Sequence, residues 1–432
     1  MCGGYIPAVT SWQPTRRSTV SWATYDLANT IFALGVGSLY FPEWLTDNVA
    51  GIPAWLTDGE SADLAQAVAV NAAMVIVIVL GPWIGARSDH SGTRRAYLVP
   101  ATLLCIVPTA FLATVSVPAS LLLFSVALVG FNLGGVVYDA MLPDVSTPET
   151  AGRVSGLGVA VGYLGSFVAV VVGAVLLDRS GHPAVFRAIA VLFLLFALPA
   201  FFFVRERPRR RRDGSPPALR ASFRRLIAAW RLARTYPGVA RFLVGRFFYT
   251  DAINTLINGF LTIYVIEELD FSDGEVQALL AVAITGAILG GVAGGLLVDR
   301  VGPRRMLHGV LGAWLVAFTI GIAAGITDIG PLAWPLGVLG GMSLGATWAS
   351  DRVYMARLSP PVHLGEFYGL YATVGRFASI LGPLMWGLIV TVFGLPRELA
   401  MASLMVFLVV ARVILRGVDD RPREWSLADR GE

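Results

Sequence analysis

One stretch of eleven residues occurs twice in this chain. Gly85-Ala-Arg-Ser-Asp89-His-Ser-Gly92-Thr-Arg94-Arg95 has the pattern G-x3-D-x2-G-x-R-R, and Gly295-Leu-Leu-Val-Asp299-Arg-Val-Gly302-Pro-Arg304-Arg305 repeats it with identical spacing 210 positions later. Each copy connects two long apolar segments, and their separation is close to half of the 432 residues. A polar connection that recurs at half the chain length predicts two structural repeats. We call these copies the first and second signature loops.

Two more pairs of segments recur in the same order. Asp26-Leu-Ala-Asn29-Thr30 matches Asp251-Ala-Ile-Asn254-Thr255 at an offset of 225. A looser pair, offset by about 213, relates Asp139 and Gly152-Arg153-Val154-Ser155-Gly156 to Asp351 and Gly365-Glu366-Phe367-Tyr368-Gly369. Because all three offsets lie close to half the chain, the pattern indicates two parallel repeats, an architecture that holds substrate between its halves.

The composition indicates a lipid environment. Hydrophobic residues make up 56% of the chain and charged residues only 14%, whereas a soluble domain carries about 25% charged residues. Stretches long enough to cross about 30 Å of hydrocarbon recur along the whole chain. We therefore predict an all-α integral membrane protein with twelve transmembrane helices in two six-helix repeats, at 19–44, 62–86, 96–116, 119–141, 154–177, 184–204, 241–266, 276–298, 306–326, 331–351, 367–393 and 396–416.

Arginines and acids fall on opposite sides of the predicted spans. The even-numbered connections hold arginines, whereas the odd-numbered connections hold acids, from Asp47 in the first to Glu275 in the seventh. Only Arg179, Arg187 and Arg397 break this pattern. The positive-inside rule therefore places both termini and the even-numbered connections in the cytoplasm, and we expect a multi-pass protein of the cell membrane.

One long connection, residues 205–240, divides the chain into an N-terminal bundle (1–204) and a C-terminal bundle (241–416), which a tail (417–432) follows. The connection begins with an arginine run and has one apolar helical face between 218 and 234, made of Leu219, Phe223, Leu226, Ile227 and Trp230. This pattern is typical of an amphipathic helix on an anionic membrane surface, so anionic lipids are its expected partners. Beside twelve spans, we expect no nucleic acid on the arginine run.

Several segments resemble a known family. The doubled signature loop resembles that of the major facilitator superfamily, although Arg87, Ser88 and His90 depart from its usual pattern around the first aspartate. Within the superfamily, segments in both halves are similar to the unknown major facilitator family, which includes the fungal vacuolar amino-acid effluxer linked to autophagy. The resemblance implies a solute carrier. It rests on Trp22-Ala-Thr-Tyr25-Asp26-Leu-Ala-Asn29, Tyr138-Asp-Ala-Met-Leu142-Pro143-Asp144, Gly152-Arg153-Val-Ser155-Gly-Leu-Gly158-x3-Gly162-Tyr163-Leu-Gly165, Phe248-Tyr249-Thr-Asp251-x3-Thr255 and Glu366-Phe367-Tyr368-Gly369-Leu-Tyr371-x9-Leu381-Gly382-Pro383.

Two of the acids inside predicted spans occupy matching places in the two halves. Asp26 and Asp251 sit two or three turns into their helices, where an unpaired carboxylate costs several kcal/mol and is functional by default. Asn29 and Asn254 follow three residues later and share a helix face with the acids, so each pair is a candidate for substrate or proton binding. The alternative is that both acids lie near enough to the boundary to be hydrated or to cap a neighbouring helix.

Two arginines lie well inside predicted spans. Arg246 precedes Asp251 by five residues, which aligns a direct pair poorly, and it can also extend to the membrane surface. Since Asp26 has no basic residue in its span, we expect Asp26 to be the proton-binding carboxylate and Asp251 a structural or substrate-orienting one. Arg376 either holds an anionic substrate group or pairs with an acid across the cavity.

Aromatic residues offer a weaker indication of a binding site. Tyr25 and Tyr163, with Trp348 and Tyr371, are candidates to line a central cavity, although such residues more often serve in packing.

The signature loops are candidate gates. Asp89 and Asp299 end a helix close to the starts of spans eleven and five, where a helix N-terminus favours an acid by about 0.3–1 kcal/mol. Breaking such contacts would bias the two halves between inward and outward states; the alternative is charge that only sets topology. The spacings Gly158-x3-Gly162, Gly290-x3-Gly294, Gly291-x3-Gly295 and Gly341-x3-Gly345 suit close helix packing.

These features favour a secondary transporter that works by alternating access on a small-molecule substrate, coupled to protons or another cation. Amino-acid export fits the family resemblance; a cation-coupled sugar symporter is the alternative, and a sensor or scaffold without transport is a third reading. No catalytic cluster, nucleotide motif or metal-ligand spacing occurs in the sequence. We therefore expect no enzyme activity, no cofactor and no metal, and a monomer.

Overall fold

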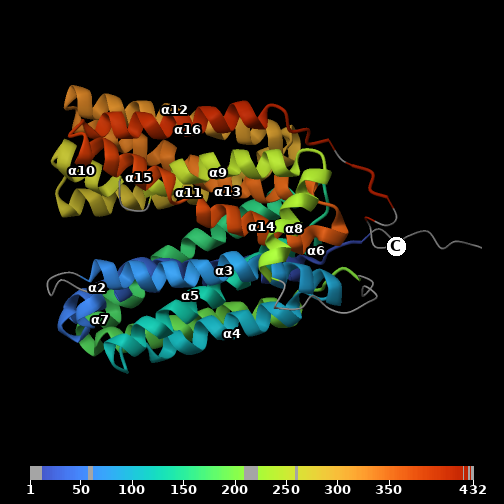
Figure 1. Cartoon of the computed structure of the whole chain (residues 1–432), viewed down its shortest axis with the longest axis horizontal. Helices are drawn as coiled ribbons and strands as arrows, with labels where there is room; N and C mark the ends of the chain where they lie inside the picture. Colours follow the sequence, from blue (N-terminus) through green and yellow to red (C-terminus); the bar gives the residue numbers. More distant parts are fainter. Residues whose placement is uncertain are drawn as a thin grey trace, which may run out of the picture.

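The computed structural model describes residues 12–56, 62–208, 222–257, 261–421, 423–426 and 429. In these residues every regular element is helical and no strand occurs. Buried apolar side chains form two clusters. One comes mainly from residues 22–204 and the other mainly from 233–418. Figure 1 shows the two sets of helices stacked on each other, with the blue-to-green helices below the yellow-to-red ones.

The first half contains six spans. One long helix bends at Gly181, whose φ of 72° is left-handed, so it supplies the fifth and sixth spans together. The first span continues through a π-helical segment, Ala33–Tyr40, and two short 3-10 turns, Val49–Gly51 and Ala54–Leu56, follow it. The α-helices are α1 (Arg16–Phe32), α2 (Phe41–Asp47), α3 (Asp63–Ser91), α4 (Arg95–Phe111), α5 (Val117–Ala140), α6 (Leu142–Val145) and α7 (Ala151–Phe203).

The second half repeats this arrangement after a connecting helix, α8 (Ser222–Thr235). Its eleventh span is broken between α14 and α15 and ends in a π-helical segment, Leu388–Val392, and short 3-10 turns lie at Gly330–Leu332 and Pro361–His363. The α-helices are α9 (Val239–Thr255), α10 (Leu261–Leu269), α11 (Asp273–Val301), α12 (Pro303–Thr327), α13 (Ala333–Leu358), α14 (Leu364–Phe377), α15 (Leu381–Gly387) and α16 (Arg397–Leu415).

The twelve predicted spans are confirmed in the described part of the chain, since each predicted range falls on a continuous or broken helix. By length and hydropathy alone, seven helices there qualify as membrane spans, and one of them is the fused α7. Helices α1, α4 and α9 have 17 residues each and are shorter than any of these seven, and α13 is not among the seven either.

Both ends of the described chain lie at one end of the bundle. The Trp12 indole N–H donates to the Asp144 carbonyl at the end of α6 (3.0 Å), and the Arg304 amide at the start of α12 donates to Asp420 in the tail (3.0 Å). Figure 1 places α6, α8 and the C-terminus at the same end of the molecule. We call this end, which also holds both signature loops, the arginine-rich side.

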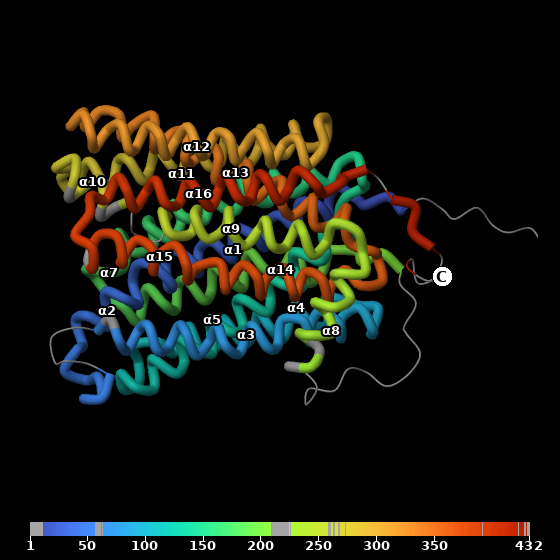
Figure 2. Tube along the Cα trace, turned by 45° about the horizontal axis from the view of Figure 1, so that its top comes forward, coloured from blue at the N-terminus to red at the C-terminus, as the bar shows by residue number. Residues whose placement is uncertain are grey.

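Helix α8 covers residues 222–234 of the segment predicted to be an amphipathic helix, and residues 218–221 of that segment lie outside the described residues. Its apolar face packs on protein: Ala229 and Ala233 are fully buried, and Leu226 and Trp230 pack against the second apolar cluster. The neighbours of α8 are α3, α9 and α14 (Figure 2), so it touches both halves of the molecule.

Glycines set the distance between the two halves. Helix α3 packs on α14 and α7 packs on α11, both on the arginine-rich side. A Cβ added at Gly295 would lie 2.6 Å from the Gly152 carbonyl oxygen, and one added at Gly365 would lie 2.7 Å from the Gly85 carbonyl oxygen. Larger residues would hold the helices apart, which confirms the predicted close packing at Gly295 and extends it to Gly365.

Candidate functional site

The first signature loop joins the two halves through Asp89, near the end of α3. Its carboxylate accepts hydrogen bonds from the amides of Gly365 and Glu366, both 3.0 Å long. These amides open α14, so the acid lies on the positive end of that helix. The predicted position of Asp89 at the start of span eleven is confirmed. We call this contact the first latch.

The second signature loop makes the equivalent contact with the halves exchanged. Asp299, near the end of α11, accepts hydrogen bonds from the amides of Gly152 (2.6 Å) and Arg153 (2.9 Å), which open α7. The Arg153 guanidinium Nε lies 3.3 Å from the same carboxylate, but its side chain is 55% exposed. The predicted position of Asp299 at the start of span five is confirmed, and we call this contact the second latch.

Each signature loop turns on its second glycine. Gly92 has φ 75° and ends α3, and Gly302 has φ 85° and ends α11. Side chains rarely adopt this left-handed backbone, so glycine allows the chain to reverse directly into the next helix. This sharp turn brings the loop arginines back toward the helix ends.

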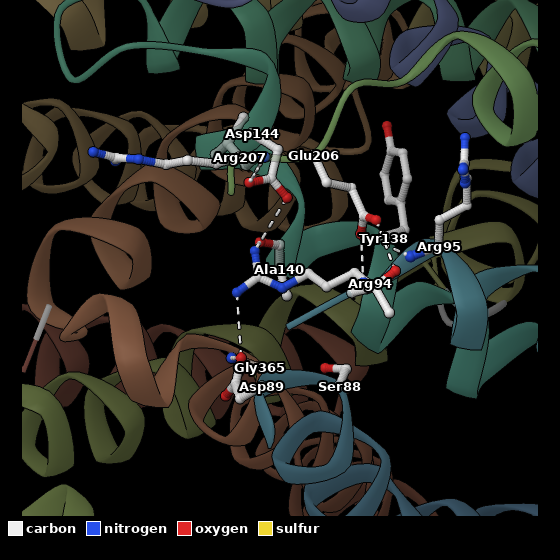
Figure 3. Close-up of polar contacts among 12 residues, drawn as sticks. Ser88, Asp89, Arg94, Arg95, Tyr138, Ala140, Asp144, Glu206, Arg207 and Gly365 are labelled. Carbon is white, nitrogen blue, oxygen red and sulfur yellow. Dashed lines mark hydrogen bonds and ion pairs between the residues drawn. The ribbon is translucent and has the colours of Figure 1, made fainter. Parts of the chain in front are cut away.

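One arginine of the first loop, Arg94, is buried among acids (Figure 3), whereas Arg95 is exposed. The Arg94 guanidinium, 1% exposed, lies 3.3 Å from Asp89 and 3.4 Å from Asp144, and it also donates to the Ala140 carbonyl. Asp144 is itself fully buried. A buried guanidinium needs such partners because an unpaired charge in this setting is costly.

Glu206, which follows the sixth span, completes this cluster. Its carboxylate accepts hydrogen bonds from the amides of Arg94 and Arg95 (the latter 2.9 Å) and from the Thr93 hydroxyl (2.8 Å). The acid thus caps the N-terminus of α4, and the Arg95 guanidinium binds the Phe201 carbonyl (3.0 Å). In the first loop, both arginines and the N-terminus of the following helix therefore have hydrogen-bond partners.

In the second loop, the following helix is capped, but the arginine side chains have no acidic partners among the described residues. Asp420 in the tail caps α12 through the Arg304 amide, as Glu206 caps α4. The Arg304 guanidinium binds the Arg416 carbonyl, and Arg305 is exposed. Among the described residues, no ion pair joins either arginine to an acid, which distinguishes this loop from the first.

A second group of charges lies deeper in the bundle. The Arg352 guanidinium, from α13, lies 3.2 Å from Asp26 of α1 and 3.1 Å from Asp139 of α5. All three side chains are largely buried, at 12%, 13% and 20% exposure respectively. Arg352 also stands 5.5 Å from the centre of the Tyr138 ring. One arginine of the second half therefore holds two acids of the first.

Arg246 pairs with a different acid from the one nearest in sequence. Its guanidinium Nε lies 3.3 Å from Asp351 of α13 and its centre 3.5 Å from the centre of the Tyr371 ring. The Tyr249 hydroxyl donates to the same Asp351 oxygen (3.2 Å). Arg246 is 5% exposed and therefore does not extend to the membrane surface.

Asp26 and Asp251 have exchanged the environments that the sequence indicated. Asp26, expected to lack a basic partner, pairs with Arg352, whereas Asp251 has no ion pair among the described residues. Asp251 accepts a hydrogen bond from the Gly382 amide (2.7 Å) at the start of α15, so it caps a neighbouring helix as the alternative reading proposed. The expected partners were wrong, because spacing along one helix says nothing of partners from another, whereas the roles expected for the two acids stay predictions.

The remaining candidates surround the break between α14 and α15. Asn254 donates to the Ala378 carbonyl (3.2 Å) and the Ser379 hydroxyl (3.0 Å) within that break. Arg376, just before it, donates to the Asn132 side chain of α5 and makes no ion pair among the described residues. Of the two alternatives for Arg376, this state does not show the pairing with an acid, and the binding of an anionic substrate group stays a prediction. Asn29 lies in α1, and its buried Oδ1 has no described partner.

The two candidate tyrosines differ in their surroundings. Tyr25 is 1% exposed, with its hydroxyl 2.7 Å from that of Thr102 and its ring stacked on Tyr138, which is a packing role. Tyr163 is half-buried in α7 and remains a candidate.

Sequence reasoning missed three residues of these clusters: Arg352, Asp144 and Glu206. The predicted tenth span ended at 351, one residue before Arg352, whereas α13 continues to Leu358. The sequence pointed to Asp144 only as the last residue of a segment that resembles the family. The looser repeat around Asp139 and Asp351 was the signal, because two acids at matching places near helix ends require basic partners.

The whole chain can be compared with known proteins. A family model described as "Vacuole effluxer Atg22 like" matches residues 14–423. The chain belongs to this Atg22-like family. Relatives include an uncharacterized MFS-type transporter, YxiO, of Bacillus subtilis, 28% identical over 93% of this chain and 94% of the relative. Autophagy-related protein 22 of Yarrowia lipolytica is 26% identical over 56% of this chain and 46% of the relative.

Solved structures share the fold of the Atg22-like chain. The human organic anion transporter MFSD10 has a TM-score of 0.73 at 16% identity and covers 93% of this chain and 100% of its own. The proton:xylose symporter XylE has a TM-score of 0.69 at 15% identity, with 93% and 94% covered. These structures show the major facilitator fold, and together with the family match and the MFS-type relative they identify the chain as a multi-pass membrane transporter.

Proposed function

We propose that this transporter exports amino acids by alternating access and that proton movement drives the cycle. The family description names an effluxer, and the sequence resembles the fungal amino-acid effluxer, which together favour export of amino acids over sugar uptake. The observation that carries alternating access is the pair of latches. Both lie on the arginine-rich side and both join a helix end of one half to a helix start of the other.

The latches would open and close as the N-terminal and C-terminal bundles rock about the central site. In the state described here they hold the halves together on the arginine-rich side. Opening that side would remove the acceptors of four backbone amides, those of Gly152, Arg153, Gly365 and Glu366. Water would replace these contacts, so the two states can lie close in free energy, as a transport cycle needs.

The bridge from Asp26 through Arg352 to Asp139 is the proposed coupling element. Two carboxylates share one guanidinium, which leaves one negative charge in a largely buried place. A proton that binds either acid weakens the bridge between the halves and favours opening on that side. The bridge replaces the earlier expectation that Asp26 acts without a basic partner.

The break between α14 and α15 is the proposed substrate site. Discontinuous helices are typical of transporter binding sites, because their freed backbone groups face a polar ligand. Arg376 Nε and Asp251 Oδ1 are buried and have no hydrogen-bond partner among the described residues. Arg376 offers a donor to a carboxylate and Asp251 an acceptor to an ammonium group, which together suit a zwitterion.

Transport in proteoliposomes tests these assignments. We expect counterflow of radiolabelled amino acids in the parent protein and a loss of about tenfold or more in Arg376→Gln and Asp251→Asn, which lose charge-assisted contacts. Asp139→Asn should abolish uptake driven by a pH gradient but keep counterflow, which needs no net proton movement. Arg231→Gln on exposed α8 is the matched control and should transport normally. Counterflow of pentoses alone would favour the sugar symporter, and no counterflow at all would favour a sensor or scaffold.

The proposed orientation places the arginine-rich side in the cytoplasm of a cell-membrane protein. Single cysteines in a background without Cys2 and Cys105 test it in intact cells. Asp328→Cys, on the opposite side, should react with an impermeant maleimide, and Ser426→Cys should not. The reverse result would overturn the orientation while leaving the fold intact.

A further inference from the structure

A basic cavity lies on the arginine-rich side of the second half. It has a volume of about 1030 Å³ and is bounded by the adjoining ends of α11, α12, α13 and α16 and by residues 417–421 of the tail. Seven arginines and three aspartates line it, an excess of four positive charges. Asp299, the acid of the second latch, forms part of the wall.

The aspartates do not neutralise these arginines. Asp299 accepts the hydrogen bonds of the second latch, and Asp420 caps α12. Asp419 lies 3.8 Å from Arg421, a pair that is largely exposed. Among the described residues, no ion pair joins the other lining arginines to an acid within the cavity, so their mutual repulsion is not offset there.

The need for topogenic charge does not explain this arrangement. The positive-inside rule requires arginines on one side of a membrane, but it does not gather them around one cavity. The first half meets the same rule with Arg94 buried between two acids. In the second half, the stretch that follows Asp351 holds Arg357, which lines the cavity, and has no acid corresponding to Asp144.

We propose that this cavity binds a ligand that carries phosphate groups. Arginines recognise phosphate through paired N–H donors, and several of them around one cavity suit more than one phosphate. The buried Nε2 of His308, which has no described hydrogen-bond partner, offers one more polar contact in the wall. A soluble polyphosphate and the headgroup of an anionic lipid share this chemistry. The site is separate from the central substrate site and adjoins the second latch.

Binding of inorganic pyrophosphate to the purified full-length protein in neutral detergent tests the soluble source. We expect pyrophosphate to raise the unfolding temperature in a saturable way, because it binds the native state. The pocket variant, Arg305→Gln with Arg416→Gln, should weaken its binding by about tenfold or more. The control variant, Arg231→Gln with Arg234→Gln, removes the same charge from exposed α8 on the same side and should bind as the parent does. Arg300→Gln with Arg412→Gln is a second pocket variant if the first does not fold.

Nanodiscs test the lipid source. If phosphatidylglycerol stays bound to the parent protein in native mass spectrometry, and is lost from the pocket variant but not from the α8 control, the ligand is a headgroup. If pyrophosphate binds and the lipid does not, the ligand is soluble. Equal binding by parent and pocket variants, equal losses in pocket and α8 variants, or no binding of either probe would overturn the proposal.

Discussion

The two signature loops share a sequence pattern but differ in what surrounds it. In both, the aspartate caps a helix of the opposite half, and a later acid, Glu206 or Asp420, caps the helix that follows the loop. The first loop buries its arginine between Asp89 and Asp144. The second leaves its arginine on the wall of a basic cavity.

This difference separates two roles within one motif. The aspartate keeps its contact with a helix start in both halves, and the second glycine keeps its positive φ, so they belong to the fold and to the contact between the halves. The arginines have diverged. In the first half the arginine is a structural part of a buried cluster, whereas in the second it faces the proposed ligand site.

Asp144→Asn should have the largest effect among tests of this comparison. It removes one partner of the buried Arg94, and breaking a buried ion pair costs about 3–5 kcal/mol because the other charge is left behind. Asp420→Asn in the tail should cost less than about 1 kcal/mol, since the amide oxygen can still cap α12 at the protein surface and only the charge is lost. Reversible unfolding in mixed micelles measures both.

If Asp144→Asn and Asp420→Asn were equally stable, the first loop would not contain a buried charge cluster that stabilises the protein. Asp144→Asn combined with Arg94→Met separates the causes, because it removes the charge as well as its partner. We expect this double variant to recover part of the lost stability, as buried pairs replaced by apolar groups often do.

The two latches should respond to substitution to different degrees. Asp89→Asn and Asp299→Asn each weaken two charge-assisted hydrogen bonds between the halves, worth about 1.5–3 kcal/mol apiece before water replaces them. Both variants should shift the resting state toward opening on the arginine-rich side, and Asp89→Asn more, because the hydrogen bonds of Asp89 to α14 are buried whereas those of Asp299 to α7 are partly exposed. Spin-label distances between α3 and α14, and between α7 and α11, measure the shift. Unchanged distances in both variants would leave the aspartates as topogenic charges only.

Much of the fold could be predicted from the sequence because it depends on local properties. Span positions follow from hydropathy, and the repeats follow from spacing. The latches were also predictable, since Asp89 and Asp299 had to end helices near the starts of α14 and α7. The position of α8 followed from its one-sided apolar pattern, but its packing on protein rather than on lipid did not.

The pairing of the buried charges could not be predicted in the same way. Arg246 lies close to Asp251 in sequence, yet it pairs with Asp351 on another helix. Arg352 fell outside the predicted tenth span because hydropathy ends a span where charged residues begin. When the charged residues are buried inside the bundle, this criterion ends the span too early. The ion-pair partners of buried charges in a helical bundle come from different helices. The sequence alone does not say how these helices are aligned along one another.

Glu206→Gln should have a smaller effect than the latch variants. Glu206 accepts from the start of α4 and lies beside the exposed end of that helix. The neutral amide keeps an acceptor for one amide but loses the charge, so we expect about 0.5–1 kcal/mol of destabilisation. Asp420→Asn should cost a similar amount, since Asp420 makes the same contact in the second half. The difference between the two variants measures how far the two helix caps are equivalent.

Arg153→Gln should have the smallest effect and thereby tests what the second latch consists of. Its side chain is 55% exposed, and exposed ion pairs contribute about 0–1 kcal/mol. The amides of Gly152 and Arg153 still donate to Asp299 in the variant, so the distance between α7 and α11 should not change. A shift as large as that of Asp299→Asn would mean that the guanidinium, and not the helix start, holds the acid. In that case the two latches would differ in kind, because Asp89 is held by backbone amides of α14 and by the buried Arg94 from its own half.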